Sequence, residues 1–184
     1  GAFFRLTKQD ADRFNVKLEY EGSSPEADAQ RRRRERLYAL LDQAATFYER
    51  VLWAESGKAV QEYLASRGLA EEACKEFRLG LSPAGATLSK KAREKGFTSE
   101  ELAGAGLVTR RGTDYFQSRL MFPLADARGR IIGFQARKLL DDDPLKGKYV
   151  NSPESELFHK TNVLYGLHLA RRRGKEGLAR RAQV

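Results

Sequence analysis

The sequence contains very few residues that could carry metal or disulfide chemistry. Its 184 residues include one cysteine, Cys74, and two histidines, His159 and His168. A single cysteine cannot form an internal disulfide, and a structural zinc site needs about four Cys or His ligands. The two histidines share no ligand or triad spacing with each other or with Cys74. The composition therefore excludes a structural zinc site and a serine-hydrolase site, and Cys74 is expected to be buried.

Long apolar runs and the glycine motifs of common nucleotide-binding folds are also absent. No window approaches the run of about 18 to 20 apolar residues that a membrane helix needs, and the first residues lack the pattern of a signal peptide. The chain has neither a P-loop nor the glycine fingerprint of a dinucleotide-binding fold. We therefore expect a cytoplasmic protein with no membrane partner.

The chain does have enough apolar residues for a folded core, and it has a strong excess of positive charge. Hydrophobic residues make up 41% and aromatic residues 10%, which is typical of a globular domain. The net charge of +9 is unevenly placed. Residues 1–106 carry 18 Lys and Arg against 17 Asp and Glu, whereas residues 107–184 carry 16 against 8. This excess favours a nucleic-acid or nucleotide surface in the second part, although a generally basic solvated surface would give the same count.

Hydrophobic periodicity predicts that the first part of the chain is mostly helical. A long helix is expected from Glu26, because apolar residues recur at three- and four-residue steps between Leu37 and Leu52. Thr98 and Glu101 have the spacing of a capping box, which opens a short helix. Shorter helices are expected over residues 57–69, 70–77, 86–96 and 98–107.

Four consecutive arginines, Arg31–Arg34, lie near the start of the long helix. Because four neighbouring residues point to all sides of a helical turn, the run does not mark one face. We interpret it mainly as a solvated helix entrance, with a contact to phosphate left open.

The second part of the chain changes to the period of a β-strand. In RIIGFQARKLL, two-residue alternation places Phe134 and Ala136 on one face and Gln135 and Arg137 on the other. Gly129 suits a tight hairpin turn before this strand. Extended segments are expected over residues 107–116, 119–126 and 130–140. We therefore expect an α+β fold, in which a mostly helical first part packs on a small antiparallel β-sheet.

The acidic residues of the second part do not form a catalytic set, whereas its basic and polar residues suit unpaired nucleic acid. Asp141–Asp143 could in principle hold Mg²⁺, but they lie in a loop flanked by Pro and Gly and are interpreted as solvated. Lys and Arg contact phosphates, Tyr stacks on a base, and Asn bonds a base edge or sugar. Tyr149 would suit a hydrophobic core equally well. The candidate set is Arg119, Arg137, Lys148, Tyr149, Asn151 and Lys160.

Three segments resemble one known family in their order and spacing: RLMFPLADARGRIIGFQARKL, KYVNSPESELFHK and VLYGLHLAR. They look like the N-terminal half of the RNA polymerase core of bacterial replicative DNA primase, of the DnaG type. Upstream, ADRFNVKLEYEG and YLASRGLAEEACKEFRLGLSPAG resemble the linker region of that family and the start of its core. The resemblance implies a DNA-templated RNA polymerase that makes short primers at the replication fork, with a basic groove for the single-stranded template.

Carried over position by position, the resemblance assigns a role to each candidate residue. It implies that Arg119 and Lys160 lie near nucleotide phosphates or the catalytic centre. One departure is that Gln135 and Ala136 stand where glycines are common in the family, which bears on how closely a backbone can approach. The implied template contacts are Arg67, Arg137, Lys148, Tyr149 and Asn151.

The resemblance also implies how the chain is organised and what it lacks. Residues 1–30 are expected to be a linker, and residues 31–184 the N-terminal subdomain of the polymerase core. Within that subdomain we expect a helical part over 31–106, a basic β-rich part over 107–160 and a C-terminal helix over 163–178.

The zinc-binding, TOPRIM and helicase-interacting parts of the family have no counterpart in this sequence. We therefore expect a fragment that is inactive alone and binds no cofactor, whereas the full-length protein would use Mg²⁺ or Mn²⁺, and zinc in a separate domain. The implied partners are single-stranded DNA template, ribonucleotides and, through the missing C-terminal domain, the replicative helicase.

Two other functions fit the same residues. The first is a standalone module that binds single-stranded DNA without catalysis. The second is a helical interaction domain whose basic face meets an acidic protein. Salt dependence distinguishes the second function from the binding of nucleic acid, because phosphate binding weakens steeply as salt rises.

Overall fold

The structure of the chain is a computed structural model, which describes residues 24–140 and 145–160. The chain divides into two compact units, Gly1–Arg32 and Arg33–Val184, and the sheet and the hydrophobic clusters belong to the second. Most of the expected linker, the Asp141–Asp143 loop and the expected C-terminal helix over 163–178 lie outside the described residues. The expected domain boundary at residue 30 stays a prediction.

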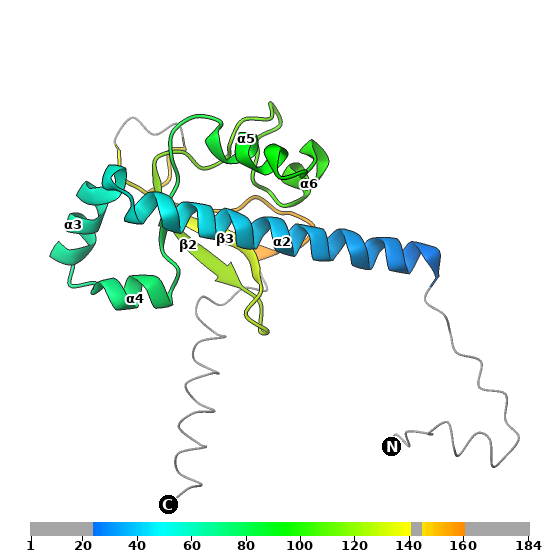
Figure 1. Cartoon of the computed structure of the whole chain (residues 1–184), viewed down its shortest axis with the longest axis horizontal. Coiled ribbons are helices and arrows are strands. Elements are labelled where there is room, and N and C mark those ends of the chain that lie inside the picture. Colours follow the sequence, from blue (N-terminus) through cyan, green and yellow to red (C-terminus); the bar gives the residue numbers. More distant parts are fainter. Residues whose placement is uncertain (1–23, 141–144, 161–184) are drawn as a thin grey trace, which may run out of the picture. The chain divides into compact units, whose positions relative to one another are not determined.

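The described residues form an α+β fold, as the sequence predicts (Figure 1). The helical segments are α2 (Pro25–Trp53), η1 (Glu55–Gly57), α3 (Lys58–Ser66), α4 (Glu71–Glu76), α5 (Thr87–Glu94) and α6 (Ser99–Gly104). The strands are β1 (Gly80–Leu81), β2 (Arg119–Ala125), β3 (Ile131–Lys138) and β4 (Tyr149–Asn151). Cys74 is buried, and the predicted capping box of Thr98 and Glu101 is present at the start of α6.

The four strands form one antiparallel sheet in the order β1-β2-β3-β4. Pro123 is tolerated in β2 because β1 pairs only with Leu120 and Met121 and ends before Pro123. The expected strand over 107–116 is reduced to an isolated bridge between Val108 and Asp114. Asp114 is instead buried and accepts hydrogen bonds from the backbone N–H groups of the first turn of α5.

One face of the sheet packs on α2, which crosses β2 and β3 (Figure 1). Tyr48 of α2 meets Phe134 of β3 edge to face, with 5.4 Å between ring centroids. Phe134 and Ala136 are fully buried on this face, as the alternation predicts. The predicted apolar stripe of α2 is buried at Leu37, Leu40, Leu41, Ala44, Ala45, Tyr48 and Leu52.

The opposite face is covered near both of its ends, at one of them by Phe158, which lies over Gly133. A second, smaller cluster joins Leu120 of β2 to Leu64 of α3 and Cys74 of α4. Gln135 and Arg137, which alternate with the buried Phe134 and Ala136, remain partly exposed. This face therefore offers polar and basic side chains beside α3.

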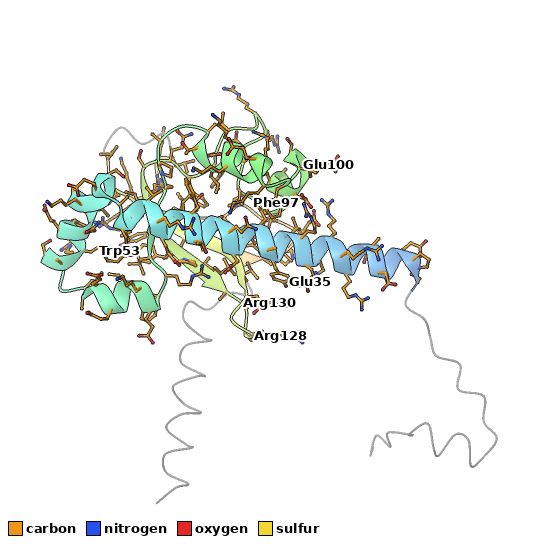
Figure 2. The ribbon with its side chains drawn as sticks, viewed as in Figure 1. Glu35, Trp53, Phe97, Glu100, Arg128 and Arg130 are labelled. Atoms are coloured by element: carbon orange, nitrogen blue, oxygen red, sulfur yellow. The ribbon has the colours of Figure 1, made fainter. Side chains whose placement is uncertain are left out.

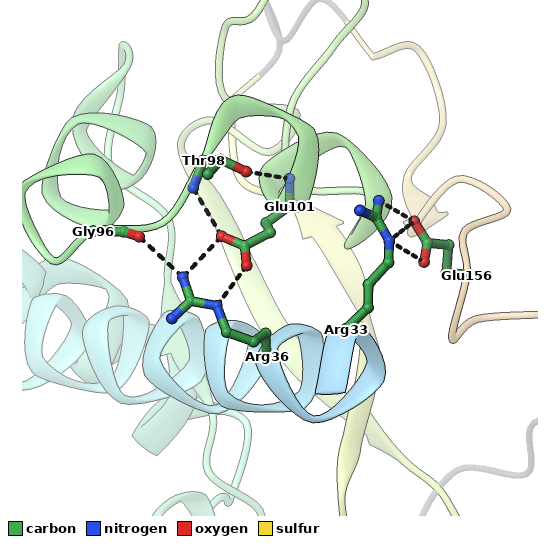
Figure 3. Close-up of polar contacts among 6 residues, drawn as sticks. All are labelled: Arg33, Arg36, Gly96, Thr98, Glu101 and Glu156. Atoms are coloured by element: carbon green, nitrogen blue, oxygen red, sulfur yellow. Dashed lines mark hydrogen bonds and ion pairs between the residues drawn. The ribbon is translucent and has the colours of Figure 1, made fainter. Parts of the chain in front are cut away.

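Two arginines of α2 form specific ties to helix α6 and to distant loops (Figure 3). Arg33 makes a bidentate ion pair with Glu156, with distances of 2.6 to 3.1 Å. Arg36 pairs with Glu101 and donates to the Gly96 carbonyl at 2.9 Å. Arg33 is exposed, as a solvated helix entrance implies, and it also ties α2 to the loop after β4.

Glu101 makes the stability of the fold sensitive to acid. The hydrogen bond from Arg36 lowers the pKa of Glu101 to about 2, from an ordinary 4.5. Because the folded-state pKa is the lower one, this stabilisation is present above about pH 4.5 and is lost as the pH falls toward 2. We expect Glu101→Gln to be less stable than the parent chain at pH 7, with a difference that shrinks between pH 5 and pH 3. Urea titrations at each pH measure this difference, and a gap that does not change with pH would contradict the assignment.

A second tie joins the hairpin between β2 and β3 to α2. The Arg130 guanidinium lies 3.9 Å from the ring centroid of Tyr38 and 3.6 Å from a carboxylate oxygen of Glu35. Figure 2 shows Glu35 on α2 and Arg130 on the hairpin, with Arg128 at its tip. The contact between Tyr38 and Arg130 thus holds the hairpin against α2.

Candidate nucleic-acid interface

The partly exposed face of β3 and β4 carries four of the residues of interest in two cross-strand pairs. Gln135 lies opposite Asn151, and Arg137 lies opposite Tyr149. The Gln135 side chain donates a hydrogen bond of 3.2 Å to the Asn151 side-chain oxygen. Tyr149 is 52% exposed, so it is not a core residue. An exposed aromatic ring next to an arginine is the arrangement that unpaired bases and phosphates require.

The end of this face near α3 is built around Tyr63. The Arg67 guanidinium donates to the Tyr63 hydroxyl at 3.2 Å, and the Arg137 guanidinium lies 4.9 Å from the Tyr63 ring centroid. The hydrogen bond from Arg67 lowers the pKa of Tyr63, and the positive charges of Arg137, Arg67 and Lys148 lower it further. Two predicted template residues therefore meet at one tyrosine of α3.

An open groove of about 670 Å³ runs between α3 and the segment that joins β3 to β4. Apolar side chains and four basic side chains line it. Its lining residues are Ala59, Val60, Tyr63, Arg137, Lys138, Leu139, Leu140, Lys146 and Lys148. A lining that combines apolar and cationic side chains suits a polyanion with flat apolar parts.

Arg119, which is expected to lie near nucleotide phosphates or the catalytic centre, contacts backbone carbonyls of the protein in this structure. It is fully buried, and its guanidinium donates to the backbone carbonyls of Gly147, at 3.1 Å, and of Leu145. Its backbone is tied to Ser82 of the segment after β1 by hydrogen bonds in both directions. In this structure Arg119 therefore holds the segment that presents Lys146 and Lys148, and a direct phosphate contact would require that segment to move.

Lys160 is the last described residue of the segment that follows β4. Its backbone N–H donates to the Glu154 carboxylate at 3.1 Å, and the residue is exposed. Phe158 of the same segment is buried against Gly133, where a Cβ atom would lie only 3.0 Å from the ring. The space that a glycine leaves on β3 is thus filled by the protein itself. Within the described residues, the hydrogen bond of the Lys160 backbone is made inside its own segment, to Glu154.

Four residues that the sequence predicts lie close together in the structure. Two further residues beside them were not predicted. Arg67, Arg137, Lys148 and Tyr149 surround one surface, and Asn151 continues it along β4. Tyr63 and Lys146 were missed. The four-residue step from Tyr63 to Arg67 on one helix was the available signal. Lys146 had no signal beyond its charge.

The described residues contain no group of three His, Cys, Asp or Glu side chains that could hold a metal ion. Within the same residues, none of the helices has the length and apolar character needed to cross a membrane.

Comparison with protein families matches residues 47–171 to the model for the DNA primase catalytic core, N-terminal domain. The DNA primase of Mycobacterium tuberculosis strain H37Rv is 38% identical over 167 residues, which are 88% of this chain and 26% of that protein. The DNA primase of Escherichia coli strain K12 is 36% identical over 179 residues, which are 95% of this chain and 30% of that protein. The chain therefore spans about a quarter to a third of the length of these relatives.

Solved structures give the same match. The RNA polymerase domain of Mycobacterium tuberculosis primase DnaG has a TM-score of 0.73 at 38% identity, covering 78% of this chain and 48% of that one. A DnaG primase catalytic domain bound to single-stranded DNA has a TM-score of 0.68 at 39% identity, covering 77% of this chain and 44% of that one.

Proposed function

The chain belongs to the DnaG-type bacterial DNA primase family, and on that premise we propose that it is the template-binding subdomain of such an enzyme. The ligand of this surface is single-stranded DNA. Its role is to hold the template while a primase synthesises a short RNA primer.

The observation that carries this proposal is the gathering of Arg67, Arg137, Lys148 and Tyr149 at one exposed place. Cations there can neutralise successive phosphates, and neutralised phosphates supply most of the affinity for nucleic acid. The exposed Tyr149 ring offers a face for one base, and such stacking tolerates any sequence. A template has to be read at every position, whatever its sequence. A surface that binds any sequence therefore suits a template.

A relative supports the choice of ligand. A DnaG primase catalytic domain that is 39% identical over the aligned part has been solved bound to single-stranded DNA. We propose that this chain takes the same ligand on the face of β3 and β4. Asn151 would bond a base edge or a sugar there.

The activity of the whole enzyme extends the proposal beyond the described residues. We propose that ribonucleotides are joined with the help of Mg²⁺ or Mn²⁺ held by other parts of a full-length primase, and that the replicative helicase binds a further part. Lys160 and Arg119 remain proposed neighbours of the nucleotide phosphates, with Arg119 acting through the segment that it holds. On this proposal the chain alone makes no primers, and it functions in the cytoplasm at the replication fork.

Fluorescence anisotropy with a labelled single-stranded oligonucleotide tests the proposal. We expect single strands to bind more tightly than duplex of the same sequence. Lys148→Ala removes one phosphate contact, so the plot of log affinity against log salt should become shallower by about 0.7. Tyr149→Ala removes a stacking face, so affinity should fall about tenfold at every salt concentration with the slope unchanged.

Arg128→Ala is the matched control, because Arg128 is an exposed arginine at the tip of the hairpin. It should leave affinity nearly unchanged. Equal salt slopes for Lys148→Ala and Tyr149→Ala would contradict this division of roles. Absence of binding by the parent chain would overturn the proposed function.

A further inference from the structure

Tyr63 is held between two arginines that come from different parts of the fold. Arg67 follows it by one helical turn at the end of α3, and Arg137 lies near the end of β3. The two guanidinium carbons lie 5.6 Å and 4.9 Å from the Tyr63 ring centroid. Tyr63 itself is partly buried in the wall of the groove beside Val60. One ring therefore contacts both arginines.

The local structure fixes this arrangement from the α3 side. The Arg67 backbone N–H donates to the carbonyls of Tyr63 and Leu64, and Gly68 then leaves the helix with a φ of 77°. Residues four apart on a helix lie on the same face, so the Arg67 side chain runs back over Tyr63 and reaches its hydroxyl. Arg67 is thus constrained by its backbone and by its side chain.

The electrostatics explain why an aromatic residue suits this place. Arg67 and Arg137 are both cations, and Lys148 adds a third charge close enough to act on the Tyr63 hydroxyl. The face of an aromatic ring carries negative potential and attracts guanidinium groups. The Tyr63 ring therefore offsets the repulsion between the arginines and keeps them at one surface.

Free arginine side chains have high rotamer entropy, which is lost when they bind a phosphate. Side chains that are already ordered lose less on binding, so affinity rises without a new contact. Because Tyr63 orders Arg67 and Arg137, an anion that these two arginines bind should be bound more tightly.

We infer that Tyr63 is a positioning residue that holds Arg67 and Arg137 ready for the backbone phosphates of a single DNA strand. The inference rests on the proposed function of this surface. Tyr63 acts through the two arginines, so its removal should weaken binding even though no charge is lost. Its hydroxyl serves Arg67, and its ring serves both arginines.

Graded substitutions separate the two parts of the side chain. Tyr63→Phe keeps the ring and removes the hydrogen bond to Arg67, so the single-strand affinity should fall about twofold to threefold. Tyr63→Leu removes the ring as well, and the affinity should fall about tenfold. The salt slope of Tyr63→Leu should also become shallower, because arginines that are no longer positioned make fewer phosphate contacts. Anisotropy with a labelled thymidine oligonucleotide measures both quantities.

A double-mutant cycle tests whether Tyr63 acts through Arg137. In the Arg137→Ala background, Tyr63→Leu should cost only about threefold, because one of the two positioned groups is already gone. An undiminished tenfold loss in that background would overturn the inference, since Tyr63 would then act independently of Arg137.

Tyr38→Leu is the matched control, because Tyr38 also lies under a guanidinium, that of Arg130, away from the groove residues. It should leave both affinity and salt slope unchanged. If the parent chain does not bind single strands, the proposed function itself fails. If the parent binds and Tyr63→Leu binds equally well with the same slope, the inference alone fails. Circular dichroism melting identifies a variant that has simply unfolded, and Tyr63→Phe then carries the test.

Discussion

Replacing Arg119 with methionine is expected to lower the free energy of unfolding by about 3 kcal/mol. Methionine fills a similar volume but donates no hydrogen bonds. The carbonyls of Leu145 and Gly147 would lose the donor that now satisfies them, beside a fully buried side chain. Guanidinium titration followed by the fluorescence of Trp53, the single tryptophan, measures the change.

The same substitution is expected to weaken single-strand binding, because the segment with Lys146 and Lys148 loses its anchor. Arg119→Lys keeps the charge without the planar fork and should recover only part of the stability. Arg128→Met, at an exposed position, should change the free energy of unfolding by less than about 0.5 kcal/mol. A loss at Arg119 no larger than that at Arg128 would contradict the anchoring role.

Adding one methyl group at Gly80 is expected to destabilise the fold by about 3 kcal/mol. A Cβ atom at Gly80 would lie 2.5 Å from the Cβ of Tyr48 and 2.7 Å from its backbone carbonyl carbon. The positions of these atoms are set by the backbone of α2, so no side-chain rotation relieves the clash. Gly80→Ala therefore forces α2 away from β1 and opens the packing of Tyr48 on Phe134.

Gly85→Ala is the control for Gly80→Ala. A Cβ atom at Gly85 would meet nothing within 4 Å, so only its φ of 74° opposes the change. A loss of about 1 kcal/mol is expected there. Equal losses at the two glycines in urea titrations would show that α2 and β1 do not approach as closely as the structure has them.

The parts of the fold that depend on local pattern could be predicted from the sequence. Alternation in β3 assigned Phe134 and Ala136 to the core and Arg137 to the other face, and this assignment is confirmed. The capping box of α6 needed only the spacing of Thr98 and Glu101. Local patterns suffice here because each feature is determined within a few residues.

Features that depend on distant partners could not be predicted. Arg119 resembles any basic residue at the start of a strand, and its burial follows from carbonyls 26 and 28 residues further along the chain. Arg33 belongs to a run of arginines, and only the fold brings Glu156 to it. Tyr63 has the helical spacing of a core residue, so its place between two arginines required the position of β3. The role of the predicted site residues in binding stays a prediction.

The lengths of the two outer strands have a consequence for how the protein behaves at high concentration. β1 has two residues and β4 has three, and Lys148 directly precedes β4 while Pro153 follows it closely. Long flat strand edges recruit strands from other molecules, whereas short edges flanked by Lys and Pro do not. Native copies of this sheet should therefore resist edge-to-edge aggregation.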